Sequence, residues 1–199
     1  MLETWYADTE GGNAIADILF GDHNPSAKLP ISFPRSAGQI PTYYNALRIG
    51  RPYTEGKPGN YTSQYFEEEQ GALYPFGFGL SFRTFTLTDL KLSASRIKRG
   101  EKLTAEATLT NTGSFEGANV VQLYIADPYA SIARPVKELK GFQKVSLKPG
   151  EARVVRFEIG PDQLKFVNGD LKEVVENGQF NVQLGLDSRN VLEQSFLLA

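Results

Sequence analysis

Near the middle of the chain, apolar and polar side chains alternate over nine residues: Lys102-Leu103-Thr104-Ala105-Glu106-Ala107-Thr108-Leu109-Thr110. Successive side chains of a β-strand point to opposite faces. Leu103 and Leu109 therefore share one face with the two alanines between them, and the threonines share the other face. The stretch predicts a strand with one buried and one exposed face.

Working outward, six more segments have strand character: Thr86–Leu92, Asn119–Ala126, Leu139–Leu147, Ala152–Ile159, Gln179–Leu186 and Val191–Leu198. Thr86–Leu92 alternates imperfectly. Turn signals separate the strands at Asn111–Gly113, at Lys148-Pro149-Gly150 and at Asn177-Gly178. About seven short strands at this spacing predict a β-sandwich over residues 85–199. Four aromatic side chains in these strands are expected to pack in its core: Tyr124, Phe142, Phe157 and Phe180.

The first 84 residues have a different pattern. Gly12–Phe20 carries apolar residues at helical spacing, and Gly21 is placed to end this helix in the left-handed conformation. Four prolines then indicate an ordered loop. Its aromatic side chains need a packing partner, which we expect to be missing from this chain: Phe33, Tyr43, Tyr44, Tyr53, Tyr61, Tyr65 and Phe66. One helix and a loop cannot bury these side chains alone.

Composition excludes several kinds of function. The chain has 21 basic and 23 acidic side chains and a formal charge of -2, so no basic field exists to attract nucleic acid. It has no cysteine, which excludes disulfides and thiolate metal sites. No apolar run is long enough to span a bilayer, and Met1 to Glu10 lack the features of a signal peptide. We expect neither nucleic acid nor a membrane as a partner.

Few residues suggest chemistry. His23 is the only histidine and is expected to be structural or solvated. Gly77–Phe82 resembles a glycine-rich phosphate loop only superficially, because a strand-rich domain follows it instead of a helix. Its glycines are expected to allow a tight turn at a domain junction. Asn60-Tyr61-Thr62 fits a glycosylation sequon, a triplet that is common by chance.

The remaining candidates are carboxylates. Asp8, Glu10, Asp17 and Asp22 lie near the helix, and Glu67-Glu68-Glu69 lies in the loop. A glycosidase needs two carboxylates about 5 Å apart for retention or about 6.5 to 9.5 Å apart for inversion, and spacing in sequence does not establish such a pair. We expect Asp8 and Glu10 to cap the helix start. The glutamate run is expected to form a solvated face or loop contacts.

A long series of motifs carries a family resemblance. In the first part it comprises Trp5-Tyr6, the stretch from Glu10 to Asp22, Asn24-Pro25-Ser26-Ala27-Lys28-Leu29-Pro30 and Tyr74-Pro75-Phe76-Gly77-Phe78-Gly79-Leu80-Ser81. In the second part it comprises Asn111-Thr112-Gly113, Val120-Val121-Gln122-Leu123-Tyr124, Arg134-Pro135-Val136-Lys137-Glu138-Leu139-Lys140-Gly141-Phe142 and Leu147-Lys148-Pro149-Gly150-Glu151. The chain resembles the C-terminal portion of glycoside hydrolase family 3, of the periplasmic β-glucosidase type.

The resemblance implies a mainly β fold in two parts. Residues 1–84 would be a remnant of the family's α/β sandwich domain, with its last strand and helix in residues 1–21, followed by a connecting segment. Residues 85–199 would be a fibronectin type III-like, immunoglobulin-like β-sandwich. The resemblance implies that the whole enzyme is a β-glucosidase whose nucleophile and acid/base lie upstream of Trp5-Tyr6, in parts of the enzyme that this chain lacks. We therefore expect no catalytic, cofactor-binding or metal-ligating residue here, and no cofactor.

The resemblance also implies partners and a location. The partners would be the missing catalytic domains and, for the whole protein, a β-glucoside substrate, and the location would be the periplasm. Alone, the chain is expected to be inactive. Two alternatives stay open: an independent interaction or carbohydrate-binding module, and residual hydrolase activity from Glu10 with a nearby aspartate.

Overall fold

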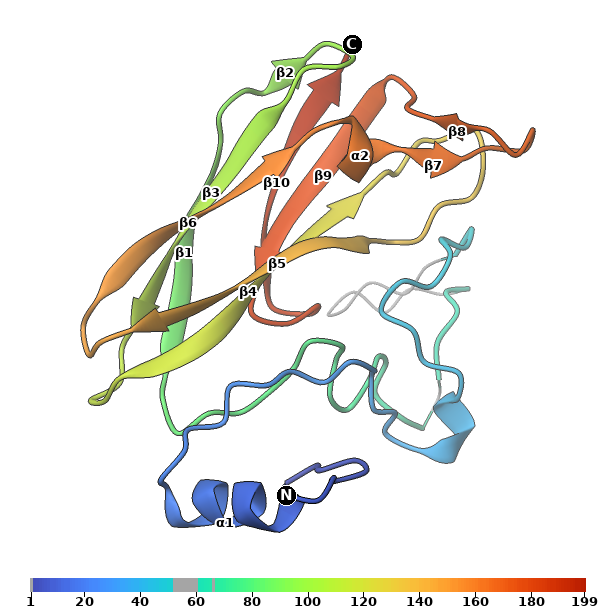
Figure 1. Ribbon diagram of the computed structural model, residues 1–199. Coiled ribbons are helices and arrows are strands. Elements are labelled where there is room, and N and C mark those ends of the chain that lie inside the picture. Colours follow the sequence, from blue (N-terminus) through green and yellow to red (C-terminus); the bar gives the residue numbers. More distant parts are fainter. Residues whose placement is uncertain (1, 52–60, 66) are drawn as a thin grey trace.

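The computed structural model describes residues 2–51, 61–65 and 67–199. Its main body is a sandwich of two β-sheets, and the N-terminal part of the chain lies below one end of this sandwich in Figure 1. The three-stranded sheet has the order β1-β3-β6 and consists of β1 (Phe85–Leu92), β3 (Leu103–Asn111) and β6 (Ala152–Ile159). The five-stranded sheet has the order β2-β10-β9-β4-β5 and consists of β2 (Arg96–Ile97), β10 (Val191–Leu198), β9 (Gly178–Gly185), β4 (Gly117–Ala126) and β5 (Glu138–Leu147).

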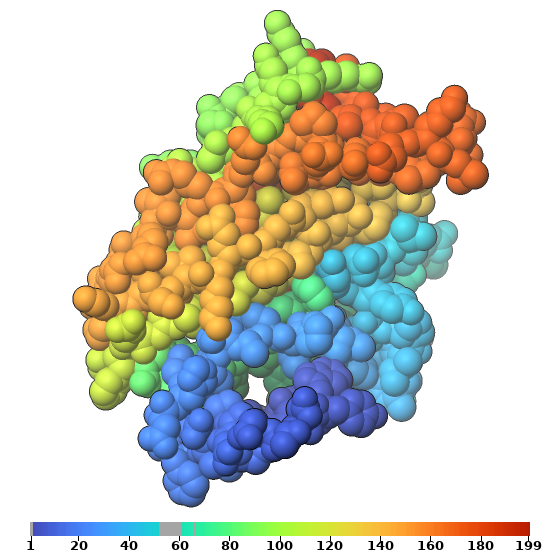
Figure 2. All heavy atoms as spheres, in the orientation of Figure 1, coloured from blue at the N-terminus to red at the C-terminus, as the bar shows by residue number. Residues whose placement is uncertain are grey.

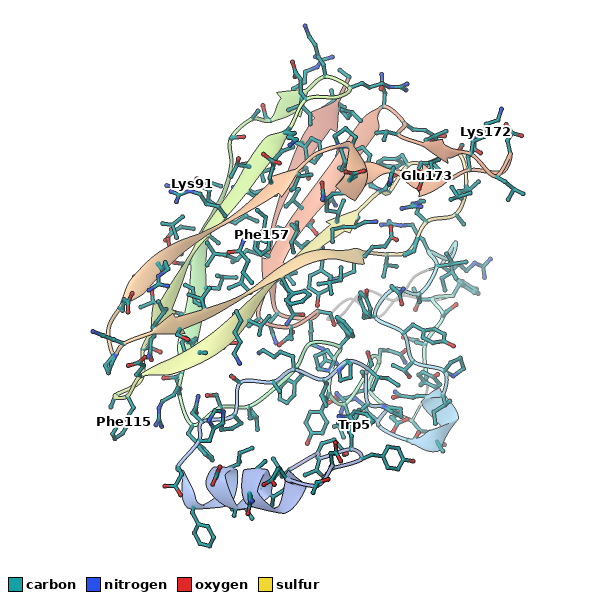
Figure 3. The ribbon with its side chains drawn as sticks, in the orientation of Figure 1. Trp5, Lys91, Phe115, Phe157, Lys172 and Glu173 are labelled. Carbon is teal, nitrogen blue, oxygen red and sulfur yellow. The ribbon has the colours of Figure 1, made fainter. Side chains whose placement is uncertain are left out.

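The alternating stretch from Leu103 to Thr110 lies in β3, in the middle of the three-stranded sheet. Its four apolar side chains are buried and its threonines face outward. Leu103 lies opposite Ile159 of β6, and Ala107 lies opposite Val155, so the inward positions of the two strands are in register. From the opposite sheet the core receives mainly Val121, Leu123, Ile125, Phe180, Val182, Leu184, Phe196 and Leu198. Figure 3 shows Phe157 of β6 lying between the sheets.

All seven predicted strands are present, and their ends differ from the prediction by at most two residues. The mainly β, fibronectin-like fold is confirmed. The imperfect alternation of the first strand has a physical cause. The register of β1 against β3 shifts between Thr88 and Lys91, and Asp89 lies at φ +60° within this β-bulge. One extra residue in one strand moves the following side chains to the other face.

Small elements were missed because two to four residues carry no readable periodicity. They are β2, the ribbon of β7 (Phe166–Val167) and β8 (Glu173–Val174), and the short helix α2 (Pro161–Leu164). The predicted turn at Asn177-Gly178 is wrong, because Gly178 begins β9. Asn177 instead accepts a hydrogen bond from Arg99 Nε at 2.6 Å through its side-chain oxygen. The chain reverses earlier, where the N–H of Leu171 bonds to the carbonyl of Asn168 between β7 and β8.

The prediction that Phe142 packs in the core is wrong. Phe157 and Phe180 are buried in the core, whereas the side chain of Phe142 is 68% exposed. Tyr124 is buried but does not belong to the core cluster between the sheets, so the prediction is wrong for this residue too. On β5 the buried residues Val145 and Leu147 point inward. Because side chains alternate along a strand, Phe142 lies on the opposite, outer face. Periodicity identified the strand correctly but did not reveal which face this aromatic residue occupies.

Among its described residues, the N-terminal part contains the one predicted helix and no sheet. Helix α1 (Gly11–Phe20) ends at Gly21, which has φ +88° as expected for a left-handed cap. A single 3-10 turn, η1 (Ala37–Gln39), follows in the loop. The strand that the resemblance implied before the helix is absent from residues 2–8. A strand needs a hydrogen-bonded neighbour, and in Figure 1 the N-terminus lies beside α1, away from both sheets.

Candidate functional site

Large apolar side chains are unusually exposed in the N-terminal part. We call the following set the unpartnered apolar residues: Tyr6, Leu19, Phe20, Ile31, Ile40, Tyr43, Leu47, Ile49, Leu80 and Phe82. Scattered exposed apolar residues are normal, but so many within one part of a chain mark a surface built to meet another protein body. These residues form the candidate functional site.

Helix α1 is the clearest case. None of its residues is buried, and the side chain of Phe20 is 85% exposed. Its apolar stripe of Ile15, Ile18 and Leu19 has the spacing of a packed helix face. An isolated helix of ten residues is marginal in water without tertiary contacts. A neighbouring protein surface that covers this stripe would therefore stabilise the helix.

Part of the missing partner is nevertheless present within the chain, which corrects the prediction for two aromatic residues. Phe33 meets the ring of Tyr74 edge to face, with centroids 6.2 Å apart. The second residue is Tyr44. Its ring stacks on Phe76 with centroids 4.2 Å apart, and its edge meets Tyr124 of β4 at 5.8 Å. Neighbouring residues of β4, Leu123 and Ile125, point into the core, so Tyr124 lies on the outer face of the five-stranded sheet. Burial raises the pKa of the Tyr124 phenol, and Tyr44 and Asp187 add to this effect. The loop thus packs on the sandwich itself.

Gln122 joins the same contact from within β4. Its side-chain nitrogen donates to the carbonyls of Gly77 at 3.1 Å and Leu186 at 3.0 Å. Its side-chain oxygen accepts the hydroxyl hydrogen of Tyr124. The side chain is 3% exposed, and its polar atoms are therefore satisfied across the contact. We call the contact around Tyr44, Phe76, Gln122 and Tyr124 the joint.

Two lysines lie close to the joint. Lys137 donates from Nζ to the carbonyl of Ser188 at 2.8 Å, and its ammonium lies 5.6 Å from the centre of the Tyr124 ring. Burial lowers the pKa values of Lys137 and of Lys28, and the negative charge of Asp187 opposes the shift in both. The half-buried ammonium group of Lys137 therefore lies next to an aromatic ring of the joint.

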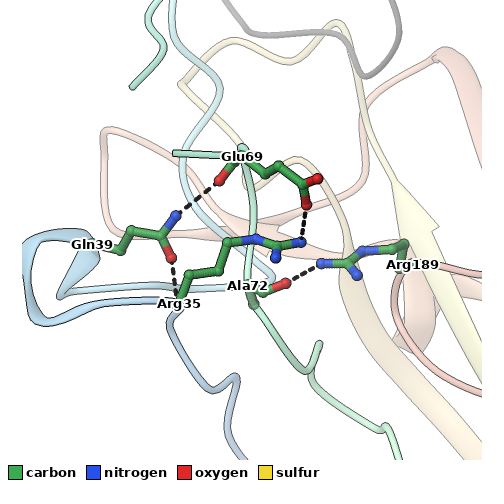
Figure 4. A network of polar contacts seen from close by, with 5 residues as sticks. All are labelled: Arg35, Gln39, Glu69, Ala72 and Arg189. Atoms are coloured by element: carbon green, nitrogen blue, oxygen red, sulfur yellow. Dashed lines mark hydrogen bonds and ion pairs between the residues drawn. The ribbon is translucent and has the colours of Figure 1, made fainter. Parts of the chain in front are cut away.

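A polar network links two further loop segments to the sandwich (Figure 4). Gln39 accepts a hydrogen bond from the backbone N–H of Arg35 at 2.8 Å and donates to the carbonyl of Glu69 at 3.0 Å. Arg35 also pairs with the Glu69 carboxylate at 2.7 Å. From the sandwich, Arg189 donates to the carbonyl of Ala72. These contacts join the two loop segments to each other and attach Ala72 to the sandwich.

In the described part of the chain, the carboxylates near α1 do not form a catalytic pair. Asp8, Glu10, Asp17 and Asp22 are all exposed. The prediction that Asp8 and Glu10 cap the helix is wrong, because no side-chain cap bond is made there. Glu10 accepts a bond from the Asn13 amide at 2.6 Å, and Asp8 accepts one from the N–H of Thr9 at 2.7 Å. Both carboxylates find partners outside the free N–H groups of the first turn.

The glutamate run forms loop contacts, which was one of the two expected roles. Glu68 accepts a hydrogen bond from the Ser36 hydroxyl at 2.7 Å, and Glu69 pairs with Arg35. His23 is exposed, and its backbone N–H bonds to the carbonyl of Asp17. Asn60 of the glycosylation triplet lies outside the described residues.

The Gly77–Phe82 segment makes a tight approach and is no phosphate loop, because strand β1 follows it. Gly77 has φ +77°, and a Cβ atom there would lie 2.0 Å from the Gln122 side-chain oxygen. Only glycine fits both demands. The sequence carried a signal for this contact, since Gln122 interrupts an apolar run in β4. Its partners could not be identified because they lie 45 and 64 residues away.

Exposed aromatic residues of the sandwich do not gather into a sugar-stacking platform. Phe115 lies in the turn before β4 and carries the Arg83 guanidinium over its ring at 4.6 Å (Figure 3). Tyr129 follows β4, and Phe142 lies within β5. The first two flank opposite ends of the same strand. This arrangement does not favour the carbohydrate-binding alternative.

Two open depressions lie in the sandwich, and neither is lined by the carboxylates near α1. One, of about 480 Å³, is lined by Leu87, Leu184, Leu186, Asp187, Asn190, Val191 and Leu192. The other is lined by Arg96, Ile97, Lys98, Glu101 and Ala199. Among the described residues no group of three or more histidine, cysteine, aspartate or glutamate side chains could hold a metal ion. Within the same residues, no helix combines the length and the apolar character that crossing a membrane requires.

Comparison with known proteins gives matches over the whole chain. Residues 1–82 match the glycosyl hydrolase family 3 C-terminal domain, and residues 119–188 match the fibronectin type III-like domain. A periplasmic β-glucosidase of Salmonella typhimurium is 58% identical over 198 residues, which are 100% of this chain and 26% of that protein. A β-xylosidase of Formosa agariphila is 43% identical over 95% of this chain and 25% of its own length.

Solved structures agree with these matches. The β-glucosidase of Listeria innocua in complex with glucose superposes with a TM-score of 0.90 at 42% identity, over 99% of this chain and 27% of that one. The chain spans about a quarter of the length of the relatives it matches. It belongs to glycoside hydrolase family 3, as a C-terminal portion that ends in the family's fibronectin type III-like domain.

Proposed function

We propose that this chain is the non-catalytic C-terminal portion of a β-glucosidase that hydrolyses terminal β-D-glucosyl residues in the periplasm. Its similarity to the Salmonella typhimurium periplasmic β-glucosidase supports the activity and the location. The observation that carries the structural role is the set of unpartnered apolar residues, together with the absence of any buried residue from α1. The other domains of the parent enzyme are the partner that would cover them.

The chemistry of glycoside hydrolysis supports the non-catalytic role. The reaction needs two carboxylates that face each other across the glycosidic bond. Glu10 and the nearby aspartates are exposed side chains at the outer end of the molecule, with local hydrogen-bond partners. We therefore assign no catalytic, cofactor-binding or metal-ligating residue to this chain. The nucleophile and the acid/base would lie in the other domains.

The sandwich would brace the catalytic domains, and the division of the chain into residues 1–84 and 85–199 is part of this proposal. The change in pattern supports this division. The first strand, β1, begins at Phe85, and the β structure before it in the described residues consists only of isolated bridges, such as that of Phe33 with Tyr74. A parent enzyme that acts on β-xylosides is the nearest variant of the proposal, because of the similarity to the Formosa agariphila β-xylosidase.

Hydrolysis of aryl β-D-glucosides and aryl β-D-xylosides by the purified chain tests the proposal, with a full-length family member as positive control. We expect no turnover of either substrate. Turnover that the Glu10→Gln substitution abolishes would show that a catalytic carboxylate is present, and the non-catalytic role would be withdrawn. Retention of the inactive chain on immobilised β-glucan, lost on Tyr129→Ala or Phe142→Ala, would favour the binding-module alternative.

A further inference from the structure

We propose that the connecting segment is held on the sandwich and moves with it, so that the boundary between independently moving parts lies at Gly21–His23, upstream of the change in sequence pattern at residue 84. We call residues 24–49 and 67–84 the strap. In this account the strap is bound to the outer face of the five-stranded sheet. Helix α1 and the residues before it belong to a second body. The inference does not depend on the activity of the parent enzyme.

The two limbs of the strap pair with each other. The N–H of Leu29 bonds to the carbonyl of Phe78 at 2.8 Å, and the N–H of Gly77 bonds to the carbonyl of Leu29 at 2.9 Å. Phe33 and Tyr74 exchange backbone bonds of 2.8 and 3.3 Å. These pairs are too few to form a sheet, and an isolated two-stranded ribbon is at best marginally stable. The strap therefore needs a support.

The sandwich supplies this support through backbone bonds along the strap. The N–H of Ser188 bonds to the carbonyl of Phe76 at 2.9 Å, and the N–H of Thr112 bonds to the carbonyl of Thr84 at 2.9 Å. Farther along, Val136 donates to Ala46 at 2.9 Å, in the same place as the bridge of Leu47 with Pro135. The contacts come from loops after β3, β4 and β9. The strap is thus attached at several separated points.

Side chains close the remaining space between strap and sheet. The joint places Tyr44 and Phe76 on Tyr124, and Gln122 donates to the carbonyl of Gly77. Because a Cβ atom at Gly77 would collide with the Gln122 side chain, the absence of a side chain at Gly77 lets the strap backbone lie directly against that amide. Arg189 binds the carbonyl of Ala72, which is itself buried. Ring contacts, a buried amide and a hydrogen bond to a buried backbone carbonyl thus join the strap to the sandwich.

Residues 2–21 lack comparable support. Their hydrogen bonds, in the part of the chain that the structure describes, all have partners within residues 2–23. The ring contact of Trp5 with Phe33, with centroids 6.2 Å apart, links them to the strap. Figure 2 shows an opening between this N-terminal stretch and the strap. Firm attachment begins at Asn24, whose side-chain oxygen accepts bonds from the Ser81 hydroxyl at 2.9 Å and the Phe82 N–H at 3.0 Å.

The arrangement assigns the strap a role as an adaptor. The sandwich holds its inner side, while Ile31, Ile40, Tyr43, Leu80 and Phe82 remain exposed on it. Residues 2–21 can then change position relative to the strap by rotation at Gly21 and the two residues after it. A second body that includes α1 would meet the sandwich largely through the strap.

Amide hydrogen exchange of the 199-residue chain tests the inference, with Tyr44→Ala and its neighbour Tyr43→Ala as a matched pair. Tyr44 lies in the joint, whereas Tyr43 is 64% exposed. In the unsubstituted chain, the amides of Leu29, Phe33 and Gly77 are expected to be protected, and those of α1 to exchange nearly freely. Tyr44→Ala should speed exchange at the three strap amides at least about tenfold, and Tyr43→Ala less than about twofold.

Two results would overturn the inference. The first is exchange at Leu29, Phe33 and Gly77 as fast as in α1 in the unsubstituted chain. The second is an equal effect of the two tyrosine substitutions. Core amides of β3 and β9 should keep their protection in both variants, which verifies that the sandwich is folded. If Tyr44→Ala also unfolds the sandwich, Gly77→Ala replaces it, with Gly100→Ala as its control: Gly100 has φ +83° and open space around it, so both substitutions strain the backbone and only Gly77→Ala disturbs the joint.

Discussion

The sandwich and the N-terminal part of this chain use similar apolar residues in opposite ways. In the sandwich, Leu109 and Phe180 are almost completely buried between two sheets. In α1, Leu19 and Phe20 point into water. Both regions show the periodicity of their secondary structure, so periodicity reports the shape of an element and not whether its partner is present. The comparison distinguishes the sandwich, which buries its own core, from the N-terminal part, whose apolar side chains need another protein body to cover them.

The largest expected effect separates the two regions by one matched substitution. Leu109→Ala removes a fully buried side chain from β3 and should lower the free energy of unfolding by about 2–5 kcal/mol. Leu19→Ala in α1 should change it by less than about 0.5 kcal/mol, since the side chain contacts little and alanine favours helix. Urea unfolding followed by far-UV circular dichroism measures the change in unfolding free energy for both variants. Equal effects would mean that α1 is packed in solution.

A smaller effect is expected for a buried polar residue of the sandwich. Asn111 at the end of β3 is fully buried and donates to the carbonyls of Phe115 at 2.9 Å and Leu147 at 3.0 Å. Asn111→Ala would leave these carbonyls without their partner, at a cost of about 1–3 kcal/mol. Asn13→Ala, in exposed α1, should be nearly neutral. Thermal unfolding of both variants would contradict the account if Asn13→Ala proved the more damaging.

The smallest effect concerns pH and probes the joint between the regions. Burial lowers the folded-state pKa of Lys137, so the unfolded chain binds more protons than the folded chain between that pKa and the unfolded value of about 10.4. The free energy of unfolding should therefore gain a contribution from Lys137 that rises with pH above the folded-state pKa. The Lys137→Met variant should lack this contribution. Unfolding free energies at pH 8, 9 and 10 measure the difference between the two slopes. A steeper rise in Lys137→Met than in the unsubstituted chain would have the wrong sign.

Local patterns predicted the strands and α1 well because alternation and helical spacing depend on neighbouring residues. The bulge at Asp89 and the outward position of Phe142 were not foreseen, since both depend on register against another strand. The joint was missed for the same reason. Gln122 meets Gly77 and Leu186 across long stretches of sequence, and the partner that we expected to lie outside the chain for Tyr44 is Tyr124 of the sandwich. Family resemblance, by contrast, correctly identified the whole chain.

The most direct test of the central claim is binding of this chain to the Salmonella typhimurium relative shortened by the C-terminal quarter that the chain matches. Phe20→Asp and Leu171→Asp form a matched pair, with side chains 85% and 86% exposed in the N-terminal part and in the ribbon of the sandwich, respectively. We predict that the chain binds and restores hydrolysis of an aryl β-D-glucoside, that Phe20→Asp weakens binding at least about tenfold, and that Leu171→Asp leaves it unchanged. Absence of binding, or equal loss in the two variants, would contradict the claim that the unpartnered apolar residues of the N-terminal part receive the rest of the enzyme.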